Sequence, residues 1–126
     1  MYEKYTTEAI VLRSEERGEY DRIFTLYTRD FGLVYARASA VRRMESKMRH
    51  ALALFAPASV SLVRGTRGWR LAGARAGTHT ALSAESVHAY ARIAQLIMRL
   101  VRGEEAHEHL FAVLAAARST CALRRG

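Results

Sequence analysis

The chain has 126 residues, 50% of them hydrophobic, which predicts one folded domain, or a small domain with an appendage, and excludes a disordered protein. Its formal net charge of +8 favours an anionic partner, with nucleic acid ahead of an acidic membrane surface. The single cysteine, Cys121, excludes an intramolecular disulfide and a cysteine-based zinc site. No apolar run approaches the roughly 18 residues that span a bilayer, and the N-terminus lacks the pattern of a secretion signal, so we predict an unprocessed cytosolic protein.

The first third of the chain predicts three strands joined by polar turns. Residues 6–13 are rich in β-branched and apolar side chains, and the polar stretch SEERGE after them predicts a turn centred on Gly18. A second strand is predicted over residues 21–28. RDFG predicts a tight turn at Gly32, followed by a third strand over residues 33–41. Alternation along the second strand sorts its side chains onto two faces, Ile23, Thr25 and Tyr27 against Phe24, Leu26 and Thr28.

The middle of the chain predicts a short helix and two further strands. Apolar residues recur at three- and four-residue spacing between residues 42 and 55, which indicates a helix ended by Pro57. Residues 59–63 alternate strictly between apolar and polar side chains. Residues 69–76 alternate apolar or small side chains with bases, and the turn RGTRG joins the two strands.

Beyond residue 80 the apolar period changes to 3.6, which is typical of helices. Ser83 is the predicted N-cap of the first helix, with Ser86 as an alternative one turn later, and Gly103 is its predicted stop. A second helix is predicted over residues 105–118. The apolar stripe of the first helix consists of Val87, Tyr90, Ala91, Ala94, Ile97, Met98 and Val101.

This order of elements predicts a mainly β protein with some α. Five strands with a helix between the third and fourth follow the plan of the OB fold, a small five-stranded barrel. We therefore expect an OB-fold DNA-binding domain over residues 1–80 and a helical hairpin over residues 81–126.

The positive charge is concentrated in one part of the chain. Residues 37–75 contain nine bases and one acid, so this segment alone carries a net charge of +8, equal to that of the whole chain. Arginine and lysine neutralise phosphates and release counterions, and aromatic side chains beside them stack on bases. The alternative interpretations are a solvated surface run for the bases and core positions for the aromatics Tyr27, Tyr35 and Trp69. The candidate DNA-binding residues are Arg37, Arg42, Arg43, Lys47, Arg49, Arg67, Trp69 and Arg70.

No set of residues predicts catalysis or a cofactor. Glu19, Asp21 and Arg22 are close in sequence, but adjacent strand residues point to opposite faces, so an Asp21–Arg22 or Glu19–arginine ion pair at a turn is the preferred interpretation. His107 and His109 would diverge by about 200° on a helix, which is unsuitable for a shared metal ion. We predict no catalytic residue, no metal site, no cofactor and no enzymatic activity.

The stretch GEYDRIFTLYTRDFG, residues 18–32, resembles the signature of RecO, the bacterial recombination-mediator family of DNA repair. Further stretches are similar in the same order, namely EAIVLR, LVYARASAVRRMESKMR, LALFAPASVSLVRGTRGWRL and GEEAHEHLFAVLAAA. The resemblance implies an N-terminal OB domain followed by the first two helices of a helical domain. The family's zinc-binding insertion has no counterpart here, because its cysteines are absent.

The resemblance also implies a function. RecO-like proteins bind single- and double-stranded DNA, anneal complementary strands, act with a RecR partner and contact the tail of single-strand-binding protein. The family places tail binding largely in helices beyond the two present here, and it has a basic, DNA-facing stretch at the position of RRMESKMR. We therefore expect a sequence-independent DNA-binding protein of recombinational repair in the bacterial cytoplasm, associated with the nucleoid.

Two alternatives remain open at this point. One is a protein-interaction module that docks a RecR-like partner with little DNA binding of its own. The other is a truncated or split gene product that needs a missing half. An exposed apolar patch on the helices of residues 84–118 would favour the second alternative, although self-association would also cover such a patch.

Overall fold

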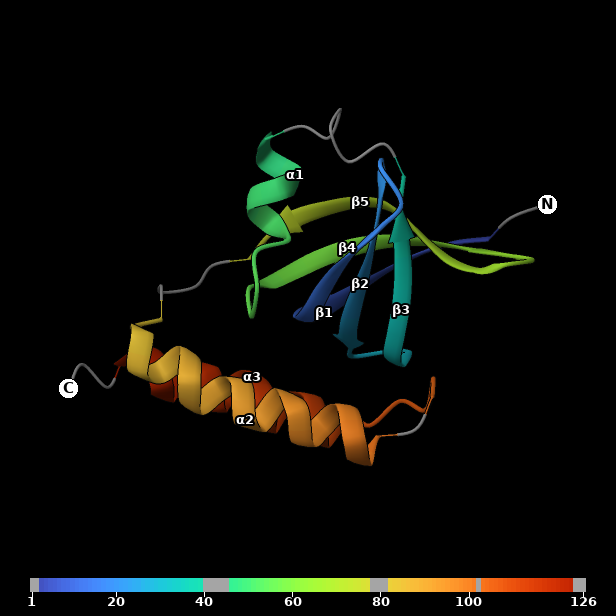
Figure 1. Cartoon of the computed structure of the whole chain (residues 1–126). Helices are drawn as coiled ribbons and strands as arrows, with labels where there is room; N and C mark the ends of the chain where they lie inside the picture. Colours follow the sequence, from blue (N-terminus) through green and yellow to red (C-terminus); the bar gives the residue numbers. More distant parts are fainter. Residues whose placement is uncertain (1–2, 40–45, 78–81, 102, 124–126) are drawn as a thin grey trace.

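The computed structural model describes residues 3–39, 46–77, 82–101 and 103–123. This part of the chain forms five strands and three helices (Figure 1). In chain order the elements are β1 (Glu3–Arg17), β2 (Asp21–Thr28), β3 (Gly32–Ala38), α1 (Ser46–Ala51), β4 (Pro57–Gly65), β5 (Gly68–Ala76), α2 (Ala84–Leu100) and α3 (Glu108–Leu123).

The strands close into a barrel in the order β1-β2-β3-β5-β4. All neighbouring strands are antiparallel except β3 and β5, which run parallel. Within the described residues, β3 and β5 pair at Ala36 with Trp69 and at Arg37 with Arg70. With α1 between β3 and β4, this is the strand and helix order of an OB fold. The predicted fold class, a five-stranded OB barrel followed by two helices, is confirmed.

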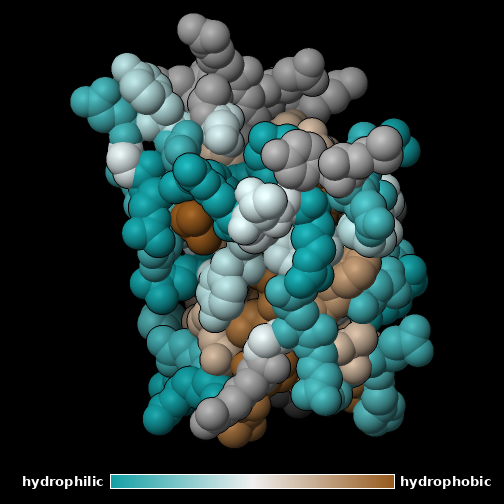
Figure 2. Space-filling model, turned by 90° about the vertical axis from the view of Figure 1, so that its right-hand side faces the viewer, coloured by the Kyte–Doolittle hydropathy of each residue, from teal (hydrophilic) through white to brown (hydrophobic). Residues whose placement is uncertain are grey.

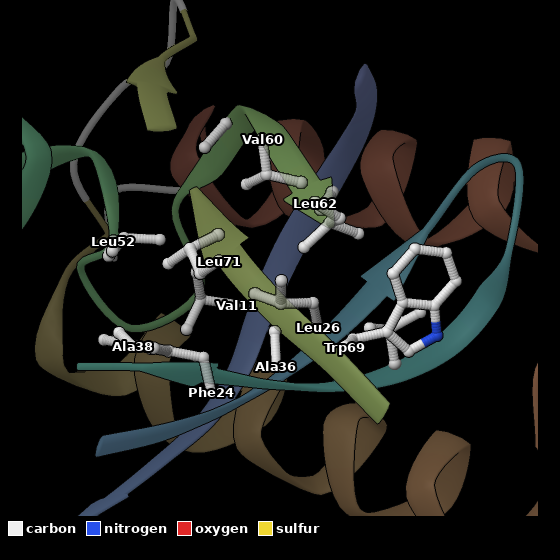
Figure 3. Close-up of a cluster of buried hydrophobic side chains, with 13 residues drawn as sticks. Val11, Phe24, Leu26, Ala36, Ala38, Leu52, Val60, Leu62, Trp69 and Leu71 are labelled. Atoms are coloured by element: carbon white, nitrogen blue, oxygen red, sulfur yellow. The ribbon is translucent and has the colours of Figure 1, made fainter. Parts of the chain in front are cut away.

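Side chains that point into the barrel form the first of two apolar clusters (Figure 3). Phe24 and Leu26 of β2 belong to it, which confirms the face predicted for these two residues. Val34 and Ala36 of β3 join them by the same alternation. Trp69 lies at one end of the cluster (Figure 3).

The second apolar cluster lies between the outside of the barrel and the helices. Its barrel side consists of Ile10, Leu12, Tyr27 and Leu33, which alternate with the inward-pointing residues of β1, β2 and β3. The helices α2 and α3 pack against each other and lie below the barrel in Figure 1, whereas α1 lies at its upper left. The two-sided apolar pattern of the second predicted strand is thus explained, since one face lines the barrel and the other packs on helices.

Close contacts attach the loop before α3 and the later part of α3 to the rest of the fold. Before α3, the Leu33 amide donates to the Gly103 carbonyl at 3.3 Å, and a Cβ at Gly32 would lie only 2.3 Å from the Glu105 carbonyl oxygen. Towards the other end, Nε of the buried Arg118 donates to the Phe55 carbonyl at 2.7 Å. The helices are therefore packed on the barrel by specific contacts as well as by apolar burial.

Several predicted boundaries were wrong. β1 continues to Arg17, because the polar residues predicted as a turn pair with the start of β2 around a tighter turn at Gly18, whose φ is 72°. β3 ends at Ala38, and residues 40–41 of the predicted third strand lie outside the described residues. α1 ends at Ala51, and Pro57 begins β4 instead of ending the helix. Proline is tolerated at a first strand position, because strand pairing does not need its missing amide hydrogen there.

The start of α2 was predicted correctly. The Ser83 side chain accepts a hydrogen bond from the Ser86 amide at 3.2 Å and caps the helix. Tyr90, Ala94, Ile97 and Val101 of the predicted stripe are buried. Leu96 and Leu100 of α2 and Val113 of α3 are exposed, so the helices carry apolar side chains away from the barrel as well.

Candidate nucleic-acid interface

A cleft of about 630 Å³ lies between the outer face of β2 and β3 and the β4–β5 hairpin. Four arginines line it, namely Arg17, Arg37, Arg67 and Arg70, and we call it the basic cleft. Its other lining residues are Ile23, Tyr35, Ser39, Val63, Gly65, Thr66, Gly68 and Trp69. Among the described residues that form its lining, none is acidic.

The hairpin that forms one wall of the basic cleft projects from the barrel (Figure 1). Figure 2 views the molecule from the side towards which this hairpin points. Hydrophilic residues cover most of this face, and hydrophobic ones are visible in the gaps between them.

Strand alternation explains why these arginines reach the cleft. On β3 the small residues Ala36 and Ala38 fill the barrel, so Tyr35 and Arg37 point outward and are exposed. On β5 the buried Trp69 precedes Arg70, which is also exposed. The two arginines are then brought together by the parallel pairing of β3 and β5, in which Arg37 lies directly opposite Arg70.

An acidic side chain approaches the cleft from β2. Oδ2 of Asp21 lies 3.7 Å from Nε of Arg37, and both side chains are partly exposed. Asp21 is the first residue of β2, and its backbone pairs with Arg17, the last residue of β1. The basic cleft is therefore bordered by one carboxylate that contacts one of its arginines.

Trp69 needs correction as a candidate for base stacking. Its side chain is only 6% exposed and packs in the barrel against Tyr5 and Phe31, with ring centroids 5.8 and 5.2 Å away. The Arg64 guanidinium lies over its ring, 4.9 Å from the centroid. Tyr27, also considered for stacking, is fully buried, whereas Tyr35 is 57% exposed and lines the basic cleft.

Arg49 lies apart from the basic cleft, in a second cavity of about 560 Å³. This mixed-charge cavity is lined by Ser14, Glu16, Gly18, Glu19, Tyr20, Asp21, Arg22, Phe24, Arg49 and Leu52. Within it, Nη1 of Arg22 donates to Ser14 Oγ at 2.6 Å, and Nη2 of Arg22 lies 3.4 Å from Glu16. Three carboxylates in the lining make this cavity a poorer place for a phosphate backbone than the basic cleft.

The predicted site residues are thus only partly brought together. Arg37, Arg67 and Arg70 share the basic cleft, and the largely buried Trp69 also belongs to its lining. Arg42 and Arg43 lie outside the described residues, as does the side chain of Lys47, whose backbone belongs to α1. Arg17 was missed, because its segment was predicted as a turn and only the extension of β1 places it beside Arg37.

The charged residues around Gly18 form ion pairs, as predicted, but with other partners. Arg22 pairs with Glu16, and Asp21 pairs with Arg37, so the predicted Asp21–Arg22 pair was wrong. The alternative, a Glu19–arginine pair, is not seen among the described residues. Within the described residues, no three histidine, cysteine or acidic side chains are grouped to hold a metal ion. No helix in the same part of the chain is long and apolar enough to cross a membrane.

The barrel and its basic cleft define a small OB-fold protein with a cationic face. Residues 1–72 match the family model described as recombination protein O N terminal, and the chain belongs to this family. It is 44% identical over 61 residues to a protein named DNA repair protein RecO from Dehalococcoides mccartyi, a match that covers 48% of this chain and 24% of that relative. A protein of the same name from Desulfitobacterium hafniense is 41% identical over 61 residues, covering 48% of this chain and 22% of the relative. The matched segment thus spans about a quarter of these relatives or slightly less.

Proposed function

We propose that this chain is a DNA-binding protein of recombinational DNA repair that binds single-stranded DNA without sequence preference. The observation that carries the proposal is the basic cleft, in which four arginines and an exposed tyrosine line one surface of an OB barrel. The names of the relatives, DNA repair protein RecO, support the repair context.

The proposed mechanism is electrostatic binding of the backbone with limited base stacking. The four arginines of the basic cleft would each neutralise a phosphate and release its counterions, a driving force that does not depend on base sequence. Tyr35, exposed between these arginines, offers one ring face for a base. Annealing would follow from lowering the repulsion between two strands, and no covalent step is involved.

A salt series tests the electrostatic mechanism. Fluorescence anisotropy of a labelled oligothymidylate is measured at increasing sodium chloride concentration, and the logarithm of the affinity is plotted against the logarithm of the salt concentration. Four neutralised phosphates predict a slope of about −3, since each contributes roughly −0.7 on a single strand. A slope near zero would contradict the proposal.

Charge reversal locates the site. We expect the combined substitutions Arg37→Glu, Arg67→Glu and Arg70→Glu to weaken DNA binding more than tenfold, since each replaces an attraction by a repulsion. The control reverses two other arginines, Arg92 and Arg99, which are exposed on α2. An equal loss per reversed charge in the control would show that only overall charge matters.

A second set of reversals tests the remaining candidate residues. Arg42, Arg43, Lys47 and Arg49 are changed together to glutamate, and the same binding assay is repeated. A loss of affinity per reversed charge beyond that of the α2 control would support the prediction that this stretch also contacts DNA. A loss per reversed charge equal to that of the control would restrict the site to the basic cleft.

Docking of a protein partner is a second candidate function. The mixed-charge cavity favours it, because its lining combines charged side chains with the apolar Phe24 and Leu52 and with the exposed Tyr20. Such a surface suits a protein segment better than a phosphate backbone. Co-elution with a RecR-like protein, with and without DNA, separates this function from DNA binding, and a Tyr20→Ala variant tests the cavity.

A further inference from the structure

The pairing of β3 with β5 places two like charges against each other. Arg37 and Arg70 are direct cross-strand neighbours, and both line the basic cleft. Like charges directly opposite each other in a sheet are destabilising. An anion beside the pair relieves that repulsion, and in the protein alone the Asp21 carboxylate lies beside Arg37 at 3.7 Å.

We infer that Asp21 is an intramolecular competitor of DNA for Arg37. This inference rests on the proposed function and assigns a role to one acidic residue at the edge of the same site. A phosphate that binds Arg37 competes with the carboxylate, because both are attracted to the same guanidinium group and repel each other. Asp21 thus keeps the arginine pair partly neutralised when no DNA is bound and sets how strongly the cleft holds a strand.

The inference predicts a gain of affinity on removal of the acid. When DNA displaces Asp21 from Arg37, the freed carboxylate regains its own counterion, which offsets part of the counterion release from DNA. We expect Asp21→Asn to bind an oligothymidylate about two- to fivefold more tightly at low salt, the range expected for a surface ion pair. The slope of the logarithm of affinity against the logarithm of salt concentration should become more negative by up to about 0.7, the contribution of one phosphate contact on a single strand.

A double-mutant cycle tests whether the effect passes through Arg37. The proteins are the wild type, Asp21→Asn, Arg37→Gln and the double variant, and their affinities are measured by the same anisotropy titration. The gain from Asp21→Asn should be present in the wild-type background and absent in the Arg37→Gln background. Asp21→Glu, which keeps the charge, should bind like the wild type, and far-UV circular dichroism checks that each variant is folded.

The control variant is Glu16→Gln. Glu16 lies on the neighbouring strand and pairs with Arg22 in the mixed-charge cavity, so its substitution removes the same charge without freeing a cleft arginine. Unchanged or weaker binding by Asp21→Asn, or an equal gain in Glu16→Gln or in the Arg37→Gln background, would overturn the inference while leaving the proposed function intact. Failure of the wild type to bind DNA would overturn both.

Discussion

At the scale of single residues, two aromatic side chains bury a polar atom that has no hydrogen-bond partner among the described residues. These atoms are the Tyr27 hydroxyl and the Trp69 indole nitrogen. Tyr27 lies in the cluster between barrel and helices, 6.1 Å from the Phe111 ring between centroids. A buried polar group without a partner loses its hydrogen bonds to water and gains nothing in return.

We expect Tyr27→Phe to raise the free energy of unfolding by about 1 kcal/mol, because it removes the buried hydroxyl and keeps the ring. Urea denaturation followed by circular dichroism measures the change. Tyr90→Phe is the matched control, since the Tyr90 hydroxyl is equally buried but donates to the Leu114 carbonyl at 3.1 Å. In the control, the free energy of unfolding should fall by about 1 kcal/mol, because a hydrogen bond is lost. A fall of similar size in Tyr27→Phe would contradict the prediction.

The same hydroxyl predicts a dependence of stability on alkaline pH. Burial raises the pKa of Tyr27 above its ordinary value of 10.0. Below about pH 10 the residue is neutral in the folded and unfolded chains alike and has no effect. Above that pH the unfolded chain loses the proton while the folded chain keeps it, so stability falls until the raised pKa is reached. Between about pH 8 and about pH 11, the free energy of unfolding should fall less steeply with pH in Tyr27→Phe than in the wild type.

At the scale of elements, the turn between β2 and β3 supports the loop that precedes α3. Thr28 Oγ1 donates to the Gly32 carbonyl and accepts from the Phe31 amide, both at 2.9 Å, so the turn is tightly held. Gly32 has a φ of 67° and has the Glu105 backbone against it. The turn is therefore part of the contact between barrel and helices.

We expect Gly32→Ala to destabilise the protein by about 2–4 kcal/mol, since a Cβ meets backbone atoms and the left-handed conformation is strained. Gly18→Ala separates the two causes. Gly18 has a similar φ of 72°, and beyond its chain neighbours no atom of the described residues lies within 4 Å of the added carbon. We therefore expect Gly18→Ala to lower the free energy of unfolding by about 1–2 kcal/mol. Equal losses in thermal or urea unfolding would show that the Glu105 contact contributes nothing.

The elements themselves were largely predictable from the sequence, because alternation and 3.6-residue periods are local properties. The faces of β2 and the cap at Ser83 were identified in this way. The end of β1 was not, because polar residues such as Glu16 and Arg17 pair as a ribbon with β2 and need no apolar pattern to do so. The partners of Asp21 and Arg22 were missed for the same reason, since they depend on strand register.

At the scale of the whole molecule, the basic cleft was only partly predictable. The concentration of bases in residues 37–75 indicated the right region, and Arg37, Arg67 and Arg70 do share one surface. Arg17 joins them only because β1 extends as a ribbon with β2, and Arg49 is directed to another cavity by the position of α1. Burial of Trp69 likewise depends on Tyr5 and Phe31, which are far away in the sequence.

The short pairing between β3 and β5 also determines where the barrel opens most easily. Within the described residues, two residue pairs join these strands, and one of them places Arg37 opposite Arg70. Local opening needs least free energy where few backbone hydrogen bonds must break, so amide hydrogens near this junction should exchange before those of β1 and β2. A ligand that binds only the closed barrel lowers the population of the open form by mass action. A strand of DNA bound across both arginines would in this way stabilise the short pairing of β3 with β5.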